Sequence, residues 1–121
     1  MPSYGIPKTR RLATQRDIIS ALRSPKRAKG ALLDVFAVDN SLSHPRLCVV
    51  VSRKTSRRAI HRNYAKRAVR EWFRREQHDI GGIDIVIRVH SELKRSSFLQ
   101  VSEELRQHLF WLRQCASYSS D

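Results

Sequence analysis

The chain has 121 residues, the usual size of one domain, and its 24 Lys and Arg against 11 Asp and Glu give a formal net charge of +13. It offers no apolar run of roughly eighteen residues to cross a membrane and begins without the apolar stretch of a secretory signal, so we expect a cytoplasmic protein without a membrane partner. Such a charge favours nucleic acid as the partner, because Arg predominates and its planar guanidinium suits phosphates and bases, although a merely solvated basic surface is the alternative.

The first helix is expected to be short. Residues 1–13 are interpreted as a basic arm, and Thr14 is expected to cap a helix whose apolar side holds Ile18, Ile19 and Leu22. Pro25 disfavours helical backbone in the residue before it, so the helix should end there.

Strand-forming segments follow the first helix. Residues 31–38 and 46–52 are rich in strand formers, and the turn residues between them, 39–45, predict that the two strands form a hairpin. The continuous apolar run of 46–52 predicts a central strand buried on both faces, with Cys48 as a small buried thiol. A further strand is predicted at 81–89, which opens with a pair of glycines.

The stretch SRKTSRRAIHRNYAKRAVREWFRRE (52–76) carries ten basic residues from Arg53 to Arg75 and a single acid, Glu71. Apolar residues recur there at helical spacing and predict a buried face of Ala65, Ala68, Val69, Trp72 and Phe73. A different face is predicted to hold Asn63, Arg67, Arg70 and Arg74, with Arg62 and Lys66 beside it. We therefore expect an amphipathic helix that presents a cationic surface.

The last helix is predicted to begin near Ser97, where SSFLQ forms a capping box, and to bury Phe98, Val101, Leu105, Leu109 and Leu112. Glu103 and Glu104 are expected to favour the dipole at its start, and residues 114–121 to form a polar tail. The order of elements (helix, strands, helix, strand, helix) predicts a single α+β domain.

Candidate catalytic groups are sparse. His61, beside the arginines, is a candidate general base for a nuclease, but a solvent-facing histidine is the more common case. Asp84 is a candidate metal ligand, but the other acids do not cluster with it as a two-metal site requires. Phe36 is a candidate for stacking under a base or else a core residue, whereas Trp72 and Trp111 are assigned to the core. The residues therefore favour a binding protein.

The segment VSRKTSRRAIHRNYAKRAVREWFR, residues 51–74, resembles the signature of the bacterial ribonuclease P protein subunit. That family carries V-[SA]-K-K, a short basic loop, and then R-N-R-x-K-R-x-x-R-E. This chain supplies Val51, Ser52, Arg53 and Lys54, then Arg62, Asn63, Lys66, Arg67, Arg70 and Glu71 at matching spacing. GIDIVIRV is similar to the family's LDIVVVA strand and KTRRLATQRDIISAL to its opening RLLKxxDFxxVF helix, so the resemblance covers roughly residues 8–112.

The resemblance implies a fold, α-β-β-β-α-β-α, with the basic helix in an unusual left-handed β-α-β crossover and one further strand within residues 26–33. It also implies a function. Ribonuclease P removes the 5′ leader from precursor transfer RNA, and in bacteria its catalytic component is RNA with metal ions at the scissile phosphate. The chain would then bind that RNA and the leader, one protein per RNA, without a catalytic side chain. Mg²⁺ would be bound mainly by the RNA, and no group would be covalently bound.

The charge pattern and the resemblance together assign residues to two RNA contacts. Contact with the catalytic RNA is expected from Arg57, Arg58, Arg62, Asn63, Tyr64, Lys66, Arg67, Arg70 and Arg74. Contact with the leader is expected from Ile18, Leu22, Phe36, Ser52, Arg53 and Lys54. The chain departs from the family at Tyr64, which replaces an arginine, and at Ile18 and Leu22, which replace two phenylalanines and so lose aromatic stacking against the leader.

Two alternatives stay open. One is a structural RNA-binding protein of the ribosomal kind, which shares a related fold and has no role in cleavage. The other is a protein-only nuclease that uses His61, which the lack of clustered acids and paired histidines disfavours. Only the 51–74 signature separates the subunit of an RNA enzyme from a ribosomal-type protein.

Overall fold

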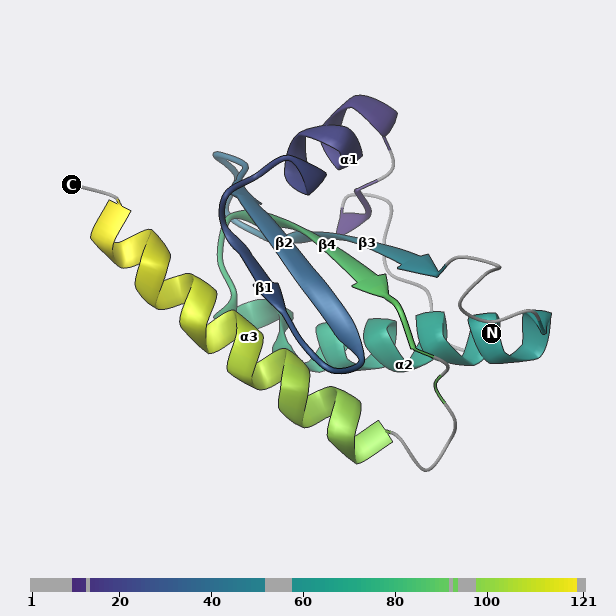
Figure 1. Cartoon of the computed structure of the whole chain (residues 1–121). Coiled ribbons are helices and arrows are strands. Elements are labelled where there is room, and N and C mark those ends of the chain that lie inside the picture. The colour runs from purple at the N-terminus through teal and green to yellow at the C-terminus, as the bar shows by residue number, and fades with distance from the viewer. Residues whose placement is uncertain (1–9, 13, 52–57, 92, 94–97, 120–121) are drawn as a thin grey trace.

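The computed structural model describes residues 10–12, 14–51, 58–91, 93 and 98–119, and the side chains among them except those of Asp79, Phe98 and 112–119. The elements in chain order are α1 (Gln15–Leu22), β1 (Arg27–Lys29), β2 (Leu33–Asp39), β3 (Arg46–Val51), α2 (Ala59–Glu76), a 3₁₀ turn η2 (Gln77–Asp79), β4 (Ile83–Val89) and α3 (Phe98–Ser119). This order confirms the α-β-β-β-α-β-α arrangement of one α+β domain, including the additional first strand (Figure 1).

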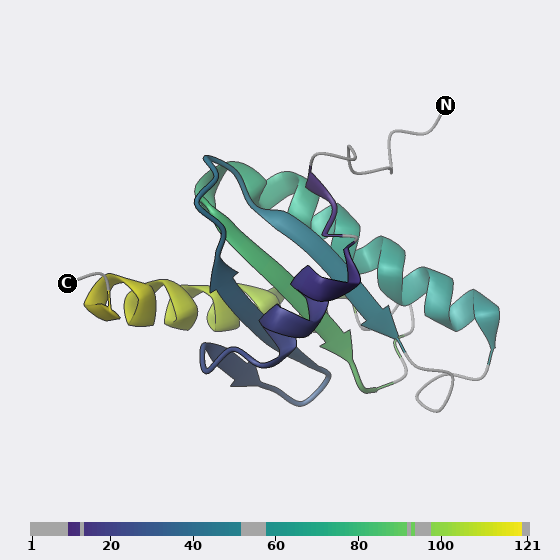
Figure 2. The ribbon, with the colours of Figure 1, turned by 90° about the horizontal axis from the view of Figure 1, so that it is seen from above.

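The four strands form one sheet in the order β1-β2-β4-β3. The β1–β2 and β2–β4 pairs are antiparallel, whereas β3 and β4 run parallel, with Val49 opposite Ile87. The two parallel strands are joined through α2, and Figures 1 and 2 show that this crossover is left-handed. Nearly all β-α-β crossovers are right-handed, so this hand is a distinguishing feature of the fold.

The strand order corrects two predictions. β2 and β3 do not form a hairpin, because β4 lies between them, and β3 is an edge strand rather than a central one. Its continuous apolar run has another cause, since one face of β3 packs against α2 and the other lies on the side of α1, which leaves most of its residues half-buried. Within the predicted basic arm, Leu12 pairs with this edge by donating its N–H to the Leu47 carbonyl oxygen at 2.9 Å, and residues 1–9 and 13 lie outside the described residues.

Apolar clusters lie on both faces of the sheet, with α2 and α3 on one side and α1 on the other (Figure 1). The larger cluster buries the predicted face of α2, which is confirmed at Ala65, Ala68, Val69, Trp72 and Phe73. The smaller cluster consists of Leu12, Ala21, Phe36 and Val86, with Ile18, Leu22, Cys48 and Val50 packed against it. Fully burying one large apolar side chain contributes roughly 1.5–3 kcal/mol, so the larger cluster holds α2 firmly on the sheet.

The short first helix is confirmed, because α1 ends at Leu22, three residues before Pro25. Thr14 occupies the N-cap position with extended backbone, but its side chain forms no capping hydrogen bond, so that part of the prediction is wrong. Ile19 is also misassigned, since 40% of it is exposed while Ile18 and Leu22 pack against the smaller cluster. The buried residue of α1 is Ala21.

In α3 the buried stripe is confirmed at Val101, Leu105 and Leu109, while Ser97 and the side chains of Phe98 and Leu112 lie outside the described residues. Trp72 is in the core as predicted, but Trp111 is 47% exposed and its core assignment is wrong. Two residues beyond Leu109, it points about 200° around the helix from the stripe. The backbone of α3 continues to Ser119, so most of the predicted polar tail is helical.

Glu104 fastens α3 to the turn between β1 and β2. Its carboxylate accepts hydrogen bonds from the backbone N–H groups of Ala31 at 2.6 Å, Leu32 at 3.1 Å and Leu33 at 3.1 Å. A Cβ atom on Gly30 would collide with this carboxylate, which explains the glycine in the turn. The prediction of a helix-dipole role for Glu104 missed this contact, because its partners lie more than seventy residues away in the sequence.

Candidate nucleic-acid interface

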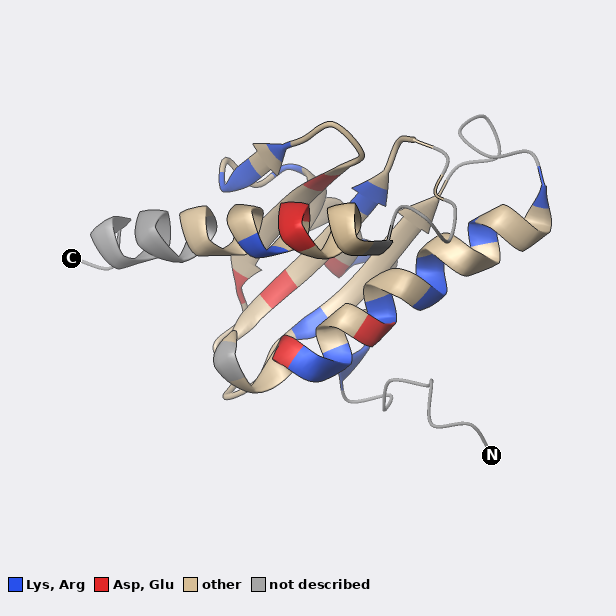
Figure 3. Ribbon diagram, turned by 90° about the horizontal axis from the view of Figure 1, so that it is seen from below, with Lys and Arg blue, Asp and Glu red and all other residues tan. Residues whose placement is uncertain are grey.

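The outward side of α2 carries a row of cationic side chains, which we call the α2 face. Figure 3 shows Lys and Arg in bands along the helix. The exposed residues are Asn63, Arg67, Arg70 and Arg74, and the half-buried Arg62 and Lys66 lie beside them. At about 1.5 Å per residue, the row from Arg62 to Arg74 extends roughly 18 Å along the helix axis. Because the opposite side of α2 is buried in the larger cluster, these charges are held at fixed positions.

The charges of the α2 face differ in how far they are neutralised. Glu71 accepts hydrogen bonds from Arg74 at 2.8 and 3.3 Å and lies 3.4 Å from Arg75. The hydrogen bond from Arg74 holds the pKa of Glu71 below its ordinary value and raises that of Arg74. Among the residues that the structure describes, Lys66 and Arg70 form no ion pair. The charge most available to a polyanion therefore lies in the middle of α2.

A shallow depression of about 440 Å³ lies at the start of α2 and is lined by Ile60, His61, Asn63, Tyr64 and Arg67. Ile60 is 70% exposed, whereas Tyr64 packs partly against the larger cluster. The depression combines an aromatic wall, an amide and a cation, which are groups that can contact an unpaired base and its phosphate. Figure 3 shows this part of α2 continuous with the rest of the cationic row.

The α1 side of the sheet holds three of the residues predicted to contact the leader. Ile18 and Leu22 pack there in one cluster with Phe36. Phe36, however, is only 2% exposed, which favours the alternative of a core residue over a base-stacking one. The guanidinium carbons of Arg27 and Arg88 lie 5.6 and 5.2 Å from the centre of its ring, so the ring is covered and offers no open stacking surface in this structure.

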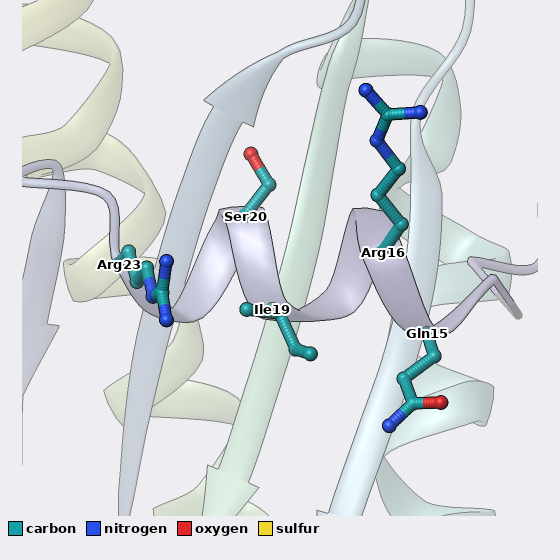
Figure 4. A pocket seen from close by; sticks show the side chains of 5 residues that line it. All are labelled: Gln15, Arg16, Ile19, Ser20 and Arg23. Carbon is teal, nitrogen blue, oxygen red and sulfur yellow. The ribbon is translucent and has the colours of Figure 1, made fainter.

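The outer side of α1 is also cationic. Figure 4 shows Arg16 and Ser20 extending to one side of the helix and Gln15 and Ile19 to the other, with Arg23 at its end. These five residues line a shallow depression of about 590 Å³. Helix α1 thus turns Ile18 and Leu22 towards the sheet and two guanidinium groups away from it.

Asp84, the candidate metal ligand, is instead saturated with N–H donors. It accepts hydrogen bonds from Arg46 Nε at 2.8 Å, Arg46 Nη2 at 2.7 Å and Asn40 Nδ2 at 2.9 Å. The hydrogen bonds that Arg46 donates to Asp84 raise the pKa of Arg46, as expected of a charge-assisted bidentate pair. Asp84 therefore has a structural role at the end of β3 and β4. Within the described part of the chain, no three His, Cys, Asp or Glu side chains converge to hold a metal ion.

None of the described helices is long and apolar enough to cross a membrane. Comparison with known proteins then identifies the family, because the model of the family described as Ribonuclease P matches residues 6–113. The chain belongs to the ribonuclease P protein family. This membership favours the subunit of an RNA enzyme over a ribosomal-type protein and implies an RNA partner.

Relatives and solved structures agree with this family. The chain is 33% identical over 120 residues to the ribonuclease P protein component of Chromobacterium violaceum, with 99% of both chains covered. It is 36% identical over 118 residues to that of Methylococcus capsulatus, covering 97% of this chain and 92% of the relative. The fold is similar to the RNase P protein of Thermotoga maritima crystallised with 1-(4-fluorophenyl)-2-thiourea, at 32% identity and a TM-score of 0.70 over 82% of this chain and 96% of that one. It is also similar to the Staphylococcus aureus RNase P protein, at 27% identity and a TM-score of 0.73 over 83% and 92% of the two chains.

For a ribonuclease P protein, the residues predicted to contact the catalytic RNA lie mostly together. Arg58 is exposed at the N-cap of α2, and Arg57 lies outside the described residues. The other predicted residues are on α2 and include Arg62, Asn63, Tyr64, Lys66, Arg67, Arg70 and Arg74. Tyr64 differs from the rest because it is partly packed in the core.

The predicted leader contacts of this ribonuclease P protein are only partly described. Ile18, Leu22 and Phe36 share the α1 side of the sheet, whereas Ser52, Arg53 and Lys54 lie outside the described residues. The sequence-based prediction missed three exposed cations on the same face, Arg27, Lys29 and Arg88. Alternation in IDIVIRV places Arg88 opposite the buried isoleucines, and this signal was available in the sequence.

Proposed function

We propose that this chain is the protein subunit of ribonuclease P. It binds the catalytic RNA through the α2 face and the 5′ leader of precursor transfer RNA on the α1 side of the sheet, and it assists endonucleolytic removal of the leader. The observation that carries the proposal is the α2 face, where Lys66 and Arg70 are mounted on a buried core and form no ion pair among the described residues. Each such charge that meets a phosphate releases condensed counterions.

The two proposed surfaces are neighbours across β3. Cys48 is half-buried on the α1 side, and burial raises the pKa of its thiol while the positive charges of Arg70 and Lys66 oppose that rise. These α2 cations therefore act electrostatically on β3, the strand that has α2 on one face and the α1-side cluster on the other.

The chemistry of cleavage belongs, on this proposal, to the RNA component and its metal ions, with Mg²⁺ bound mainly by that RNA. The protein contributes binding and orientation and no catalytic side chain. Leader contacts are absent from mature transfer RNA, so they raise affinity for the precursor alone. We further propose one protein per RNA and a cytoplasmic location.

Binding to the catalytic RNA tests the proposal. Lys66→Ala and Arg70→Ala should each weaken binding and lower the slope of log affinity against log salt by about 0.9 or less. Thermal stability should change little, because Arg70 is exposed, Lys66 is only half-buried and neither forms an ion pair among the described residues. Arg106→Ala is the matched control, since Arg106 is exposed on α3 and lies 3.9 Å from Glu103. Wild-type affinity and slope in both α2 variants would remove the α2 face from the interface.

A further inference from the structure

Two arginines cover Phe36 from the strands on either side of it. Arg27 on β1 pairs directly with Phe36 on β2, and Arg88 on β4 pairs with Asp34, two residues before Phe36 on the same face. Their guanidinium carbons lie 5.6 and 5.2 Å from the ring centre, within the range of cation–π contact. Both residues remain exposed while the ring beneath them is buried.

Each guanidinium also donates one hydrogen bond to the protein, which holds it in place. Arg88 Nη2 donates to Asp34 Oδ2 at 3.1 Å, and the Asp34 side chain is only 8% exposed. The other carboxylate oxygen of Asp34 lies 3.2 Å from His90 Nε2 and 3.4 Å from the Gly30 nitrogen, which fixes the carboxylate in turn. Arg27 Nε donates to the Ser24 carbonyl oxygen at 3.2 Å. The remaining N–H groups of both arginines are therefore oriented before any ligand arrives.

The charge on this part of the sheet is positive. Lys29 faces Asp34 from β1, so Lys29, Asp34 and Arg88 form one row across three strands, beside the row that contains Arg27 and Phe36. This face thus carries three cations, Arg27, Lys29 and Arg88, beside the single carboxylate of Asp34, and 48% of the Arg88 side chain is exposed. A guanidinium offers five N–H donors, so each arginine keeps donors for a phosphate oxygen beyond the one contact that anchors it.

We propose that Arg27 and Arg88 are phosphate-contacting residues on the α1 side of the sheet, and that they hold the backbone of the single-stranded leader there. The inference rests on the proposed function, which supplies the leader. Phe36 then acts through the arginines as a support, and no base lies directly on it. Because phosphate contacts carry no sequence information, this part of the leader is bound without base preference.

A double-mutant cycle with the wild-type catalytic RNA tests this contact. Precursor transfer RNA is prepared with single uncharged methylphosphonate linkages at successive 2′-deoxy leader positions, and its affinity is measured with wild-type protein, Arg88→Gln and Arg27→Gln. Arg88→Gln should weaken binding about tenfold and lower the salt slope by about 0.7, the value for one phosphate of a single strand. At one leader linkage, the uncharged substitution should weaken substrate binding by a similar factor when the protein is wild type. The same substitution should weaken binding by less than twofold when the protein is the variant. Adenosine and uridine leaders should respond alike.

Controls separate this inference from its alternatives. Arg27→Gln leaves no buried carboxylate without its partner, so it keeps the test valid if Arg88→Gln fails to fold, and Arg106→Gln on α3 should behave as wild type. The inference would be overturned if the arginine variants weakened the binding of precursor and mature transfer RNA equally. It would also be overturned if the effects of the protein and linkage substitutions on affinity were additive at every linkage for both arginines. If wild-type protein gave the RNA enzyme no preference for precursor over mature transfer RNA, the proposed function itself would fail.

Discussion

Tyr64 stands where the family signature is expected to carry an arginine, and it packs partly against the larger cluster while it lines the depression at the start of α2. Compared with that signature, the proposed RNA surface has one cation fewer and one aromatic wall more, and the core holds this wall in place. Phe36 shows the converse arrangement, an aromatic ring in the expected groove whose face is taken by two arginines. At both places the identity of the residue alone would mislead, because burial decides which part of the side chain a ligand can reach.

Tyr64→Arg should restore the missing charge at the expense of packing. We expect the salt slope of binding to the catalytic RNA to steepen by up to about 0.9. We expect the free energy of unfolding to fall by about 1 kcal/mol, because a half-buried aromatic side chain is lost. Salt titration and urea denaturation measure the two effects separately, and an unchanged slope would show that no phosphate lies near this position.

Substitution of Glu71 should change the stability of the protein and its affinity for the catalytic RNA in opposite directions. Its pKa is lowered chiefly by the hydrogen bond from Arg74, so its contribution to stability is present above the ordinary glutamate pKa of about 4.3 and is lost as the pH falls through the lower value in the folded protein. Glu71→Gln should therefore slightly lower the melting temperature at pH 7 and leave it unaltered well below pH 4. It should also tighten binding to the catalytic RNA at low salt by up to about fivefold, because Arg74 is released. Weaker binding at pH 7 would contradict this assignment.

Among the elements, α3 and the turn between β1 and β2 depend on each other through Glu104. Three backbone N–H groups at Ala31, Leu32 and Leu33 have this carboxylate as their acceptor. Helix α3 therefore does more than cover the core, since it also completes the hydrogen bonding of a turn far away in the sequence. Helix α2 has a different dependence, because its RNA surface is positioned by the residues on its buried side.

Glu104→Gln should destabilise the protein by about 1–3 kcal/mol, because it weakens charge-assisted hydrogen bonds to N–H groups that are partly shielded from water. Glu103→Gln is the matched control, since Glu103 is its neighbour on the same helix but is mostly exposed. Denaturant titration of both variants, with hydrogen exchange at residues 31–33, measures the effect. Equal stability of the two variants would show that the Glu104 contact contributes nothing.

For the whole molecule, local patterns were sufficient for the buried face of α2 and insufficient for the order of strands in the sheet. The buried side of α2 follows from helical periodicity within eighteen residues, and it was predicted residue by residue. The position of β4 between β2 and β3 depends on pairing between distant segments, which no local pattern records. The same holds for the arginines over Phe36, which are brought together by the register of β1, β2 and β4. The core assignment of Trp111 was wrong because it followed from the hydrophobicity of tryptophan alone. The angular position of Trp111 on the helix places it away from the buried stripe.

Purified protein without RNA should not cleave precursor transfer RNA, because the described residues offer no cluster of acids or metal ligands. His61→Ala should leave cleavage by the reconstituted enzyme within a few-fold of the wild type. Cleavage assays with RNA-free protein and with the reconstituted variant test both statements. Cleavage at the mature 5′ end by protein alone would mean that the protein is itself the nuclease.

The place of β4 in the sheet also sets an order of events during synthesis. β2, β3 and α2 are all synthesised before β4, the strand that lies between β2 and β3. Until then the nascent chain has two strands without their shared partner and a cationic amphipathic helix without the complete sheet that buries Trp72. Non-local pairing of this kind is slow to form, so the α2 face acquires its final geometry only after translation has passed residue 89.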